Sequence, residues 1–316
     1  DYYKATKDIG FIKQWYGRFS EWMRYVLDRT DENGFLVHRA DDWVFIDWHD
    51  CLRKDMDVYS FLQILLYGAF NSAQKVAVLA ENYADAERYE KLAKSLKEKI
   101  RQTFLDESTG AYFYGIKDGK LNRGIFRQIN VMAIFVGLTD DEQAKRISQT
   151  VLKNDDIPKI TTPYMRFFEF SVLCETGETK YVINEIKKYY GGMLKLNATS
   201  FWEDYDSSKS GSEHYAMYGR KYGKSLCHAW GATPLWIIGR YLLGVNADAE
   251  AQGGIIIRPA LDIADFSAEL PTVYGMLKLQ KKNGEWLIYS PHQGKIYLSG
   301  KEYEFLKDKP LRIQDV

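Results

Sequence analysis

The sequence predicts a mainly α-helical fold, an (α/α) barrel, followed by a small antiparallel β-sandwich. Over the first three quarters of the 316 residues, strongly apolar helical segments alternate with amphipathic ones. The links between them are rich in acidic and aromatic residues. After Val245 the residue pattern changes to short runs of β-prone residues. We therefore expect a barrel in residues 1–246 and a β-sandwich in residues 247–316.

The first predicted helices form an inner and an outer layer. The opening helix has an apolar stripe with a spacing of three or four residues, made by Phe11, Trp15, Phe19, Trp22 and Val26. It ends at Asn33-Gly34, which favours a left-handed turn. Residues 57–84 are apolar on most sides, as in a helix packed all round. Residues 85–105 carry one apolar stripe among charges, which predicts an outer helix facing solvent.

The same pairing recurs twice further along the chain. Residues 128–138 are short and apolar, and Thr139 to Glu142 opens an acid-rich amphipathic helix. Residues 163–174 are apolar and aromatic, and a polar helix follows Gly177. Residues 226–245 are again apolar. Alternating buried and amphipathic helices favour a closed double ring over a four-helix bundle.

The last 70 residues or so contain three β-rich runs, "GGIIIRPAL", "TVYGMLKLQKKNGEWLIYS" and "GKIYLSGKEYEFL". The segment "KKNGEW" is typical of a hairpin, because Asn-Gly suits a two-residue turn. Runs of this length and number predict a small β-sandwich.

The composition excludes several classes of function. Lys+Arg and Asp+Glu balance at 43 each, so no net charge favours nucleic acid or an anionic membrane. No apolar run approaches the roughly 20 residues that span a bilayer. The three cysteines are too few and too scattered for a disulfide scaffold or zinc site. Aromatic residues make up 15%, which suits either stacking on sugars or a large helical core.

The loop "DDWVFIDWHD", residues 41–50, combines acids with tryptophans. Its candidate substrate-binding residues are Trp43, Asp47, Trp48 and Asp50. Indole rings stack on the apolar faces of sugars, and carboxylates accept hydrogen bonds from hydroxyl groups. The alternative is a β-hairpin whose rings pack on the barrel rim and whose acids face water.

Two later segments carry further candidates. In "NATSFWEDYD", residues 197–206, Trp202 is a candidate substrate-binding residue. Glu203 follows it, and a carboxyl group beside an aromatic ring suits acid or base work near neutrality. Hydrolysis of a glycosidic bond needs two such groups. The alternative is the first turn of a helix. In "SLCHAWGATP", residues 225–234, His228 and Trp230 open an apolar segment, although a lone histidine there is often a core residue.

In their order and spacing, these segments resemble the α-L-rhamnosidases of glycoside hydrolase family 78. "NATSFWEDYD" and "SLCHAWGATP" are similar to the family's "GATTxWExWD" and "SxNHYAxGA" pair. "FRQINVMAIFVGL" is similar to a glutamine-containing helix upstream. "GGIIIRPAL" and "TVYGMLKLQKKNGEWLI" look like parts of the family's C-terminal sandwich. The resemblance runs over nearly the whole chain.

The resemblance implies an (α/α)6 barrel and inverting hydrolysis of terminal α-L-rhamnosyl residues. It implies no cofactor and no metal, and its partner is a rhamnose-containing glycan. By position, Glu203 falls on the family's general base and His228 on its sugar-contacting histidine. Trp43 and Trp48 lie in the loop where the family has a subsite tryptophan.

One family segment has no counterpart in this chain. The general acid of the family lies in "DCPxRERxGWxGD", upstream of everything matched here. The resemblance therefore implies a barrel that lacks its N-terminal helices, with the acid on the N-terminal remainder of the same polypeptide. The alternative is a stand-alone relative that uses an acid of the 41–50 loop. A non-catalytic glycan-binding module and another (α/α)6-barrel glycosidase or lyase also remain open.

Overall fold

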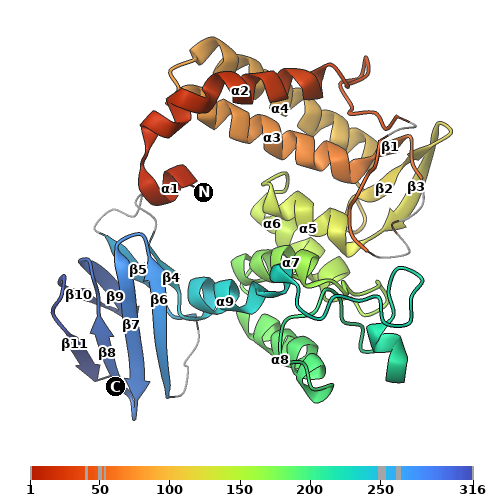
Figure 1. The fold of residues 1–316 in the computed structure, drawn as a ribbon. Helices are drawn as coiled ribbons and strands as arrows, with labels where there is room; N and C mark the ends of the chain where they lie inside the picture. The colour runs from red at the N-terminus through yellow and green to blue at the C-terminus, as the bar shows by residue number, and fades with distance from the viewer. Residues whose placement is uncertain are drawn as a thin grey trace. The chain divides into compact units, whose positions relative to one another are not determined.

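The computed structural model describes residues 2–39, 42–48, 52, 55–247, 254–260 and 265–314. The chain divides into two compact units (Figure 1). The helical unit comprises Gly10–Glu178 and Asn184–Thr233, and the strand-rich unit comprises Asp1–Ile9, Thr179–Ile183 and Pro234–Val316. The order of helices first and strands later is the one that the sequence predicts.

The helical unit is built from pairs of helices. In chain order its helices are α2 (Ile9–Leu27), α3 (Ser60–Leu79), α4 (Tyr83–Phe104), α5 (Arg127–Phe135), α6 (Asp141–Ile147), the π-helical η2 (Ser148–Leu152), α7 (Pro163–Glu175) and α8 (Thr179–Lys195). Buried residues lie on most sides of α3, whereas α4 buries one stripe at a spacing of three or four residues. The predicted inner and outer roles of these two helices are therefore confirmed.

Local sequence signals determine where several helices begin. The Asp140 carboxylate accepts a hydrogen bond from the backbone amide of Gln143 at 2.8 Å and caps α6. Thr162 precedes α7 in the same role, and Pro163 occupies the first turn, where its missing N–H costs nothing. Gly177, at φ +91°, ends α7 in the left-handed region that glycine tolerates best.

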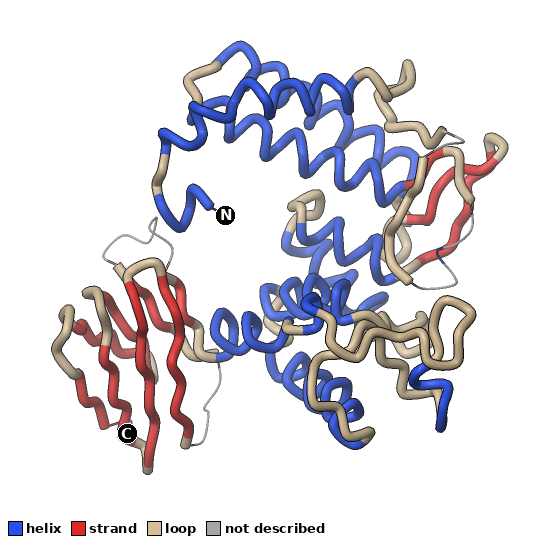
Figure 2. Tube along the Cα trace, in the orientation of Figure 1, coloured by secondary structure: helices blue, strands red, loops and turns tan. Residues whose placement is uncertain are grey.

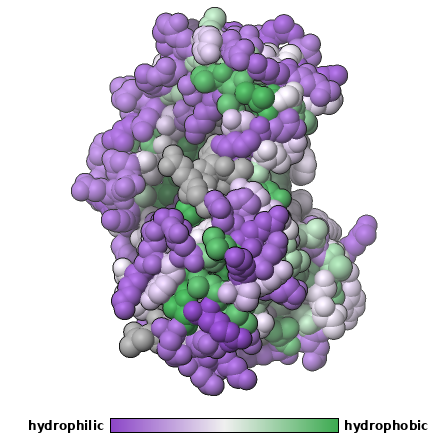
Figure 3. Space-filling model, turned by 90° about the vertical axis from the view of Figure 1, so that its left-hand side faces the viewer, coloured by the Kyte–Doolittle hydropathy of each residue, from purple (hydrophilic) through white to green (hydrophobic). Residues whose placement is uncertain are grey.

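The exposed face of α2 differs from the prediction. The sequence suggested one apolar stripe, but only one edge of it faces the protein: Phe19 and Val26 are half-buried, and Met23 beside them is buried. The rest of the stripe, Phe11, Trp15 and Trp22, is exposed, as is the neighbouring Tyr25. The apolar stripe of α2 is thus only partly covered. The face of the molecule drawn in Figure 3 shows apolar patches among polar side chains.

A small sheet replaces one predicted loop. The segment "STGAYFYGIKDGKLNRG" forms a hairpin of β2 (Phe113–Lys117) and β3 (Lys120–Ile125), and β1 (Val58–Tyr59) pairs with β2. The turn residues Asp118 and Gly119 have φ of +48° and +69°. Asp-Gly between two β-prone runs is a hairpin signal that the sequence did offer.

The predicted apolar helix over residues 226–245 is also corrected. The chain forms a 3-10 turn, η4 (Ala229–Gly231), then α9 (Thr233–Ile237) and the π-helical η5 (Ile238–Leu242). His228 and Trp230 therefore precede the regular helix. Gly231 allows this arrangement, because a Cβ atom there would lie 2.4 Å from the Cβ of Phe201.

The strand-rich unit contains α1 (Tyr2–Thr6) and two four-stranded sheets among its described residues (Figure 2). Their strands are β4 (Val245–Asn246), β5 (Ile255–Ile257), β6 (Phe266–Thr272), β7 (Gly275–Lys282), β8 (Glu285–Tyr289), β9 (Gly294–Leu298), β10 (Lys301–Phe305) and β11 (Leu311–Gln314). The orders are β10-β9-β5-β4 and β11-β8-β7-β6. Both sheets contribute to one apolar core.

Pairing in these sheets is antiparallel except between β5 and β9, which are parallel, so the expectation of a purely antiparallel unit was wrong. The predicted hairpin is confirmed: Asn283 and Gly284, at φ +50° and +78°, connect β7 to β8. Within the described parts of both units, the helices are too short or too polar to cross a bilayer.

Candidate active site

Three irregular segments of the helical unit meet beside α5 and α7 (Figure 1). They are residues 42–48, residues 153–162 and the long connection 196–232. The Thr162 hydroxyl donates to Asp47 Oδ1 at 2.6 Å, which joins the first two segments. The Tyr205 amide donates to the Thr161 carbonyl at 2.9 Å, which joins the second and third. Residues far apart in the sequence thus line one region.

Glu203 lies at the centre of this region. Its side chain is buried, and the residue is 3% exposed. The Tyr218 hydroxyl donates to Oε1, and the Ser225 amide donates to Oε2 at 3.1 Å. The Glu203 amide in turn donates to the Ser225 carbonyl at 3.0 Å. Because residues 201–205 are irregular, the alternative of a helical first turn is not what the structure shows.

Aromatic rings lead from Glu203 towards the 42–48 segment. Tyr218, whose hydroxyl binds Glu203, meets Trp48 edge-on with ring centroids 5.3 Å apart. Trp48 meets Phe45 at 4.9 Å in the same manner. Edge-on pairs of this kind are favourable beyond the area that they bury. Glu203 and Trp48, predicted separately from two loops, therefore share Tyr218 as a neighbour.

A second set of rings returns from Phe45 to Glu203. Phe45 lies 6.3 Å from the ring of Tyr164, which stacks on Trp230 at 5.2 Å and 25°. The Trp230 indole N–H donates to the Glu203 carbonyl at 3.2 Å, and the His228 ring lies 4.5 Å from Trp230. Together with Glu203, the contacts form a closed series. We call its rings the aromatic circuit: Tyr218, Trp48, Phe45, Tyr164 and Trp230.

Asp47 anchors the 42–48 segment. It is 6% exposed, and it accepts hydrogen bonds from the Thr162 hydroxyl at 2.6 Å, the Gln128 amide at 2.9 Å and the Trp48 backbone at 2.9 Å. Both carboxylate oxygens are thus engaged by the protein. These bonds tie the segment to Gln128 of α5 and to Thr162 at the start of α7, so Asp47 supports the loop. Asp50 lies outside the described residues.

The two remaining predicted tryptophans have different surroundings. Trp43 is 79% exposed, and its ring lies 5.6 Å from Phe45, so it extends the aromatic surface outwards. Trp202 is 2% exposed and packs against Tyr215 with centroids 5.6 Å apart. Its buried ring supports the loop and offers no open face for stacking.

The structure also reveals residues that the sequence did not single out. Burial and the Glu203 carboxylate raise the pKa of Tyr218 to about 12, so its hydroxyl stays protonated at neutral pH. Asp204, the neighbour of Glu203 in the chain, forms a buried ion pair with Lys224 at 2.9 Å. A cation from the far end of the same connection, Lys224, therefore lies beside the residue that follows Glu203. No spacing rule links these residues, which are 15 or more positions apart.

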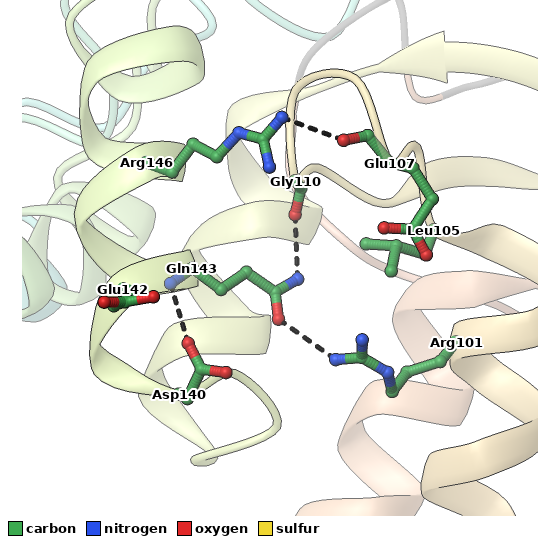
Figure 4. A pocket seen from close by; sticks show the side chains of 8 residues that line it. All are labelled: Arg101, Leu105, Glu107, Gly110, Asp140, Glu142, Gln143 and Arg146. Atoms are coloured by element: carbon green, nitrogen blue, oxygen red, sulfur yellow. Dashed lines mark hydrogen bonds between the residues drawn. The ribbon is translucent and has the colours of Figure 1, made fainter.

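A surface pocket lies elsewhere in the helical unit, between the end of α4 and α6 (Figure 4). Its polar groups form hydrogen bonds mainly with each other. The side-chain amide of Gln143 donates to the Gly110 carbonyl at 2.8 Å, and the Arg146 guanidinium donates to the Glu107 carbonyl at 2.8 Å. None of the predicted site residues lines it. Among the described side chains, no three His, Cys, Asp or Glu residues form a metal-binding group.

Residues 1–242 match the family described as the bacterial alpha-L-rhamnosidase six-hairpin glycosidase domain. The chain belongs to this family. The resemblance drawn from the loops is thereby confirmed, and a six-hairpin glycosidase domain agrees with the mainly helical first part of the chain. A comparison with curated protein sequences found no match.

Solved structures similar to this glycosidase domain include three rhamnosidases. The GH78 rhamnosidase of Bacillus sp. GL1 is 22% identical with a TM-score of 0.76, over 91% of this chain and 29% of that one. A Klebsiella oxytoca rhamnosidase, solved with rhamnose bound, is 25% identical with a TM-score of 0.65, over 76% of this chain and 44% of that one. The α-L-rhamnosidase of Dictyoglumus thermophilum is 19% identical with a TM-score of 0.66, over 93% of this chain and 33% of that one. The chain spans less than half the length of each.

Proposed function

We propose that this chain carries the general base and part of the sugar-binding surface of an inverting glycoside hydrolase. Its substrate is a glycan or glycoside with a terminal α-L-rhamnosyl residue. The observation that carries the proposal is the buried Glu203 carboxylate, oriented by two donors and joined to the aromatic circuit through Tyr218 and Trp230. Membership of the rhamnosidase family and the rhamnose bound to the Klebsiella oxytoca relative support the choice of sugar.

The chemistry follows from the hydrogen bonds that the Glu203 carboxylate can still accept. Each carboxylate oxygen has two acceptor positions, and one on each is taken by Tyr218 or Ser225. A water molecule bound to a remaining position gives its proton to Glu203 as its oxygen attacks the anomeric carbon. The bond to the leaving oxygen breaks at the same time, and a general acid protonates that oxygen. The two carboxyl groups are about 6.5–9.5 Å apart in inverting enzymes.

The general acid and the rest of an (α/α)6 barrel belong, in this proposal, to the N-terminal remainder of the same polypeptide. Asp47 is committed to three hydrogen bonds, and the chain has no counterpart of the family's acid segment. The exposed aromatic face of α2 (Phe11, Trp15, Trp22 and Tyr25) is typical of a helix that packs against further protein. The greater length of the similar rhamnosidases supports the same view.

The product's configuration tests the proposed reaction. The complete protein is incubated with an aryl α-L-rhamnoside, and the anomeric proton of the first rhamnose released is followed by NMR. We expect the β-anomer, because a single displacement by water inverts the configuration. Release of the α-anomer contradicts the mechanism. Rhamnose binding by calorimetry without any hydrolysis favours the glycan-binding module instead.

Trp43 provides a test of the sugar-binding surface. Substitution by alanine should raise KM for a rhamnosyl oligosaccharide by about 2- to 10-fold, because an exposed aromatic contact contributes roughly 0.5–1.5 kcal/mol. KM for a small aryl rhamnoside should not change, since Trp43 is the outermost ring of the series that begins at Glu203. Tyr83→Ala, which removes an exposed ring from α4, is the control. Equal losses on both substrates contradict this placement.

A further inference from the structure

Tyr218 holds the carboxylate of Glu203 in a way that the proposed chemistry requires. We propose that Tyr218 is a positioning residue: its hydroxyl fixes the plane of the Glu203 carboxylate so that the free acceptor positions face the attacking water. This inference rests on the proposed function, because it concerns the efficiency of the same base. It adds a residue that the family motifs in this chain do not include.

The geometry around Glu203 explains why one donor is insufficient. The Ser225 amide donates to Oε2 at 3.1 Å, and this single contact would leave the carboxylate free to rotate about its last torsion angle. The Tyr218 hydroxyl donates to the other oxygen, Oε1. Two donors on different oxygens define the carboxylate plane. A base must be held within a few tenths of an ångström of its working position to be effective.

The backbone places Tyr218 at some cost. Met217 and Arg220 exchange two backbone hydrogen bonds, at 3.0 and 2.9 Å, across a two-residue turn. Tyr218 and Gly219 occupy this turn with φ of +55° and +70°. A bulky residue is uncommon in the left-handed region, where glycine and asparagine are preferred. A strained residue whose side chain binds a candidate base indicates a functional role for that side chain.

The ring of Tyr218 is supported from the other side of the site. Trp48 meets it edge-on at 5.3 Å, so the phenol cannot swing away from Glu203 in that direction without losing the contact. Gly223 keeps the turn close, because a Cβ atom there would lie 2.2 Å from the Met217 carbonyl oxygen. The position of the hydroxyl is therefore determined by two loops, although the residue itself is 54% exposed.

The state of the phenol matches a positioning role. Its raised pKa, about 12, keeps it protonated through the neutral range, so it donates to Glu203 and does not compete for the proton of the attacking water. A hydrogen bond to a charged group is among the stronger ones in proteins.

Substitution of Tyr218 by phenylalanine in the complete protein tests the proposal. With an aryl α-L-rhamnoside we expect kcat to fall by about 10- to 100-fold, while KM stays within about twofold. The reason is that the substitution removes only the hydrogen bond that the hydroxyl donates to the charged carboxylate. Tyr222→Phe is the matched control: Tyr222 lies in the same loop, is 71% exposed, and has its ring against Tyr215.

A double-mutant comparison distinguishes positioning from a structural effect. In Glu203→Ala, azide can replace water and the base, because it attacks without giving up a proton. If Tyr218 acts through Glu203, Tyr218→Phe should leave this azide-dependent rate within about twofold. An equal loss with azide, a wild-type kcat in Tyr218→Phe, or a change confined to KM each overturns the proposal. A fully active Glu203→Gln protein refutes the proposed function itself, whatever Tyr218 does.

Discussion

Replacing Glu203 by glutamine in the complete protein is expected to lower kcat for an aryl α-L-rhamnoside by about 10²- to 10⁴-fold, the usual contribution of a general base. An amide cannot take the proton of the attacking water. The fold should survive, because the amide oxygen can accept from Ser225 and the amide nitrogen can donate to the Tyr218 oxygen. Sugar binding by the variant, measured by calorimetry, should stay close to that of the wild type.

The role of Glu203 has a sharper test in chemical rescue. Glu203→Ala should be as inactive as the glutamine variant, and added azide should restore turnover with formation of a β-L-rhamnosyl azide. This product is expected because azide would attack from the side that water uses. Glu32→Gln, an exposed acid on the surface, serves as the control and should keep full activity. Activity of Glu203→Gln within tenfold of the wild type would remove Glu203 from the mechanism.

Replacing Glu169 by glutamine is expected to have the largest effect on stability. Glu169 is fully buried, and its two oxygens accept from Arg127 of α5 at 3.1 Å and Arg166 of α7 at 2.8 Å. Removing the charge leaves two buried guanidinium groups without a matching anion at this point. Breaking a buried pair in this way costs about 3–5 kcal/mol of unfolding free energy. Helix α5 also carries Gln128, whose side-chain amide donates to Asp47 at 2.9 Å.

Urea unfolding followed by tryptophan fluorescence would measure this loss. The control is Glu90→Gln on α4, which breaks an exposed ion pair with Lys94 at 2.6 Å. That substitution should change the unfolding free energy by less than about 0.5 kcal/mol, because solvent screens exposed pairs and side-chain entropy opposes them. A loss below about 1 kcal/mol for Glu169→Gln would show that the arginines find other partners.

Local pattern was enough to predict most of the helices. The repeat of apolar residues on α4 and the continuous apolar run of α3 correspond to burial on one stripe and on most sides. The structure adds caps at Asp140 and Thr162, each of which accepts from a backbone amide three residues away. The predictions for α2 and residues 226–245 were less accurate. Periodicity reports which side chains are apolar, and tertiary contacts decide which of them become buried.

The candidate site was predicted only in outline. Glu203, Trp48, His228 and Trp230 were chosen from their own loops, and the structure brings them together. The residues that connect them could not be chosen in this way. Tyr218 is 15 positions from Glu203, and Thr162 is 115 positions from Asp47. Contacts of such separation arise from irregular segments with no periodic signal.

The sequence by itself indicated the family and the order of helices and strands, and it singled out Glu203 as the candidate base. These depend on residue types at short, fixed spacings. Only the tertiary structure decided that Asp47 is a loop anchor, that Trp202 is packed inside, and that Tyr218 is the neighbour of Glu203. The physical reason is that burial and hydrogen bonding depend on which loops meet, and that choice is made by the packing of whole helices.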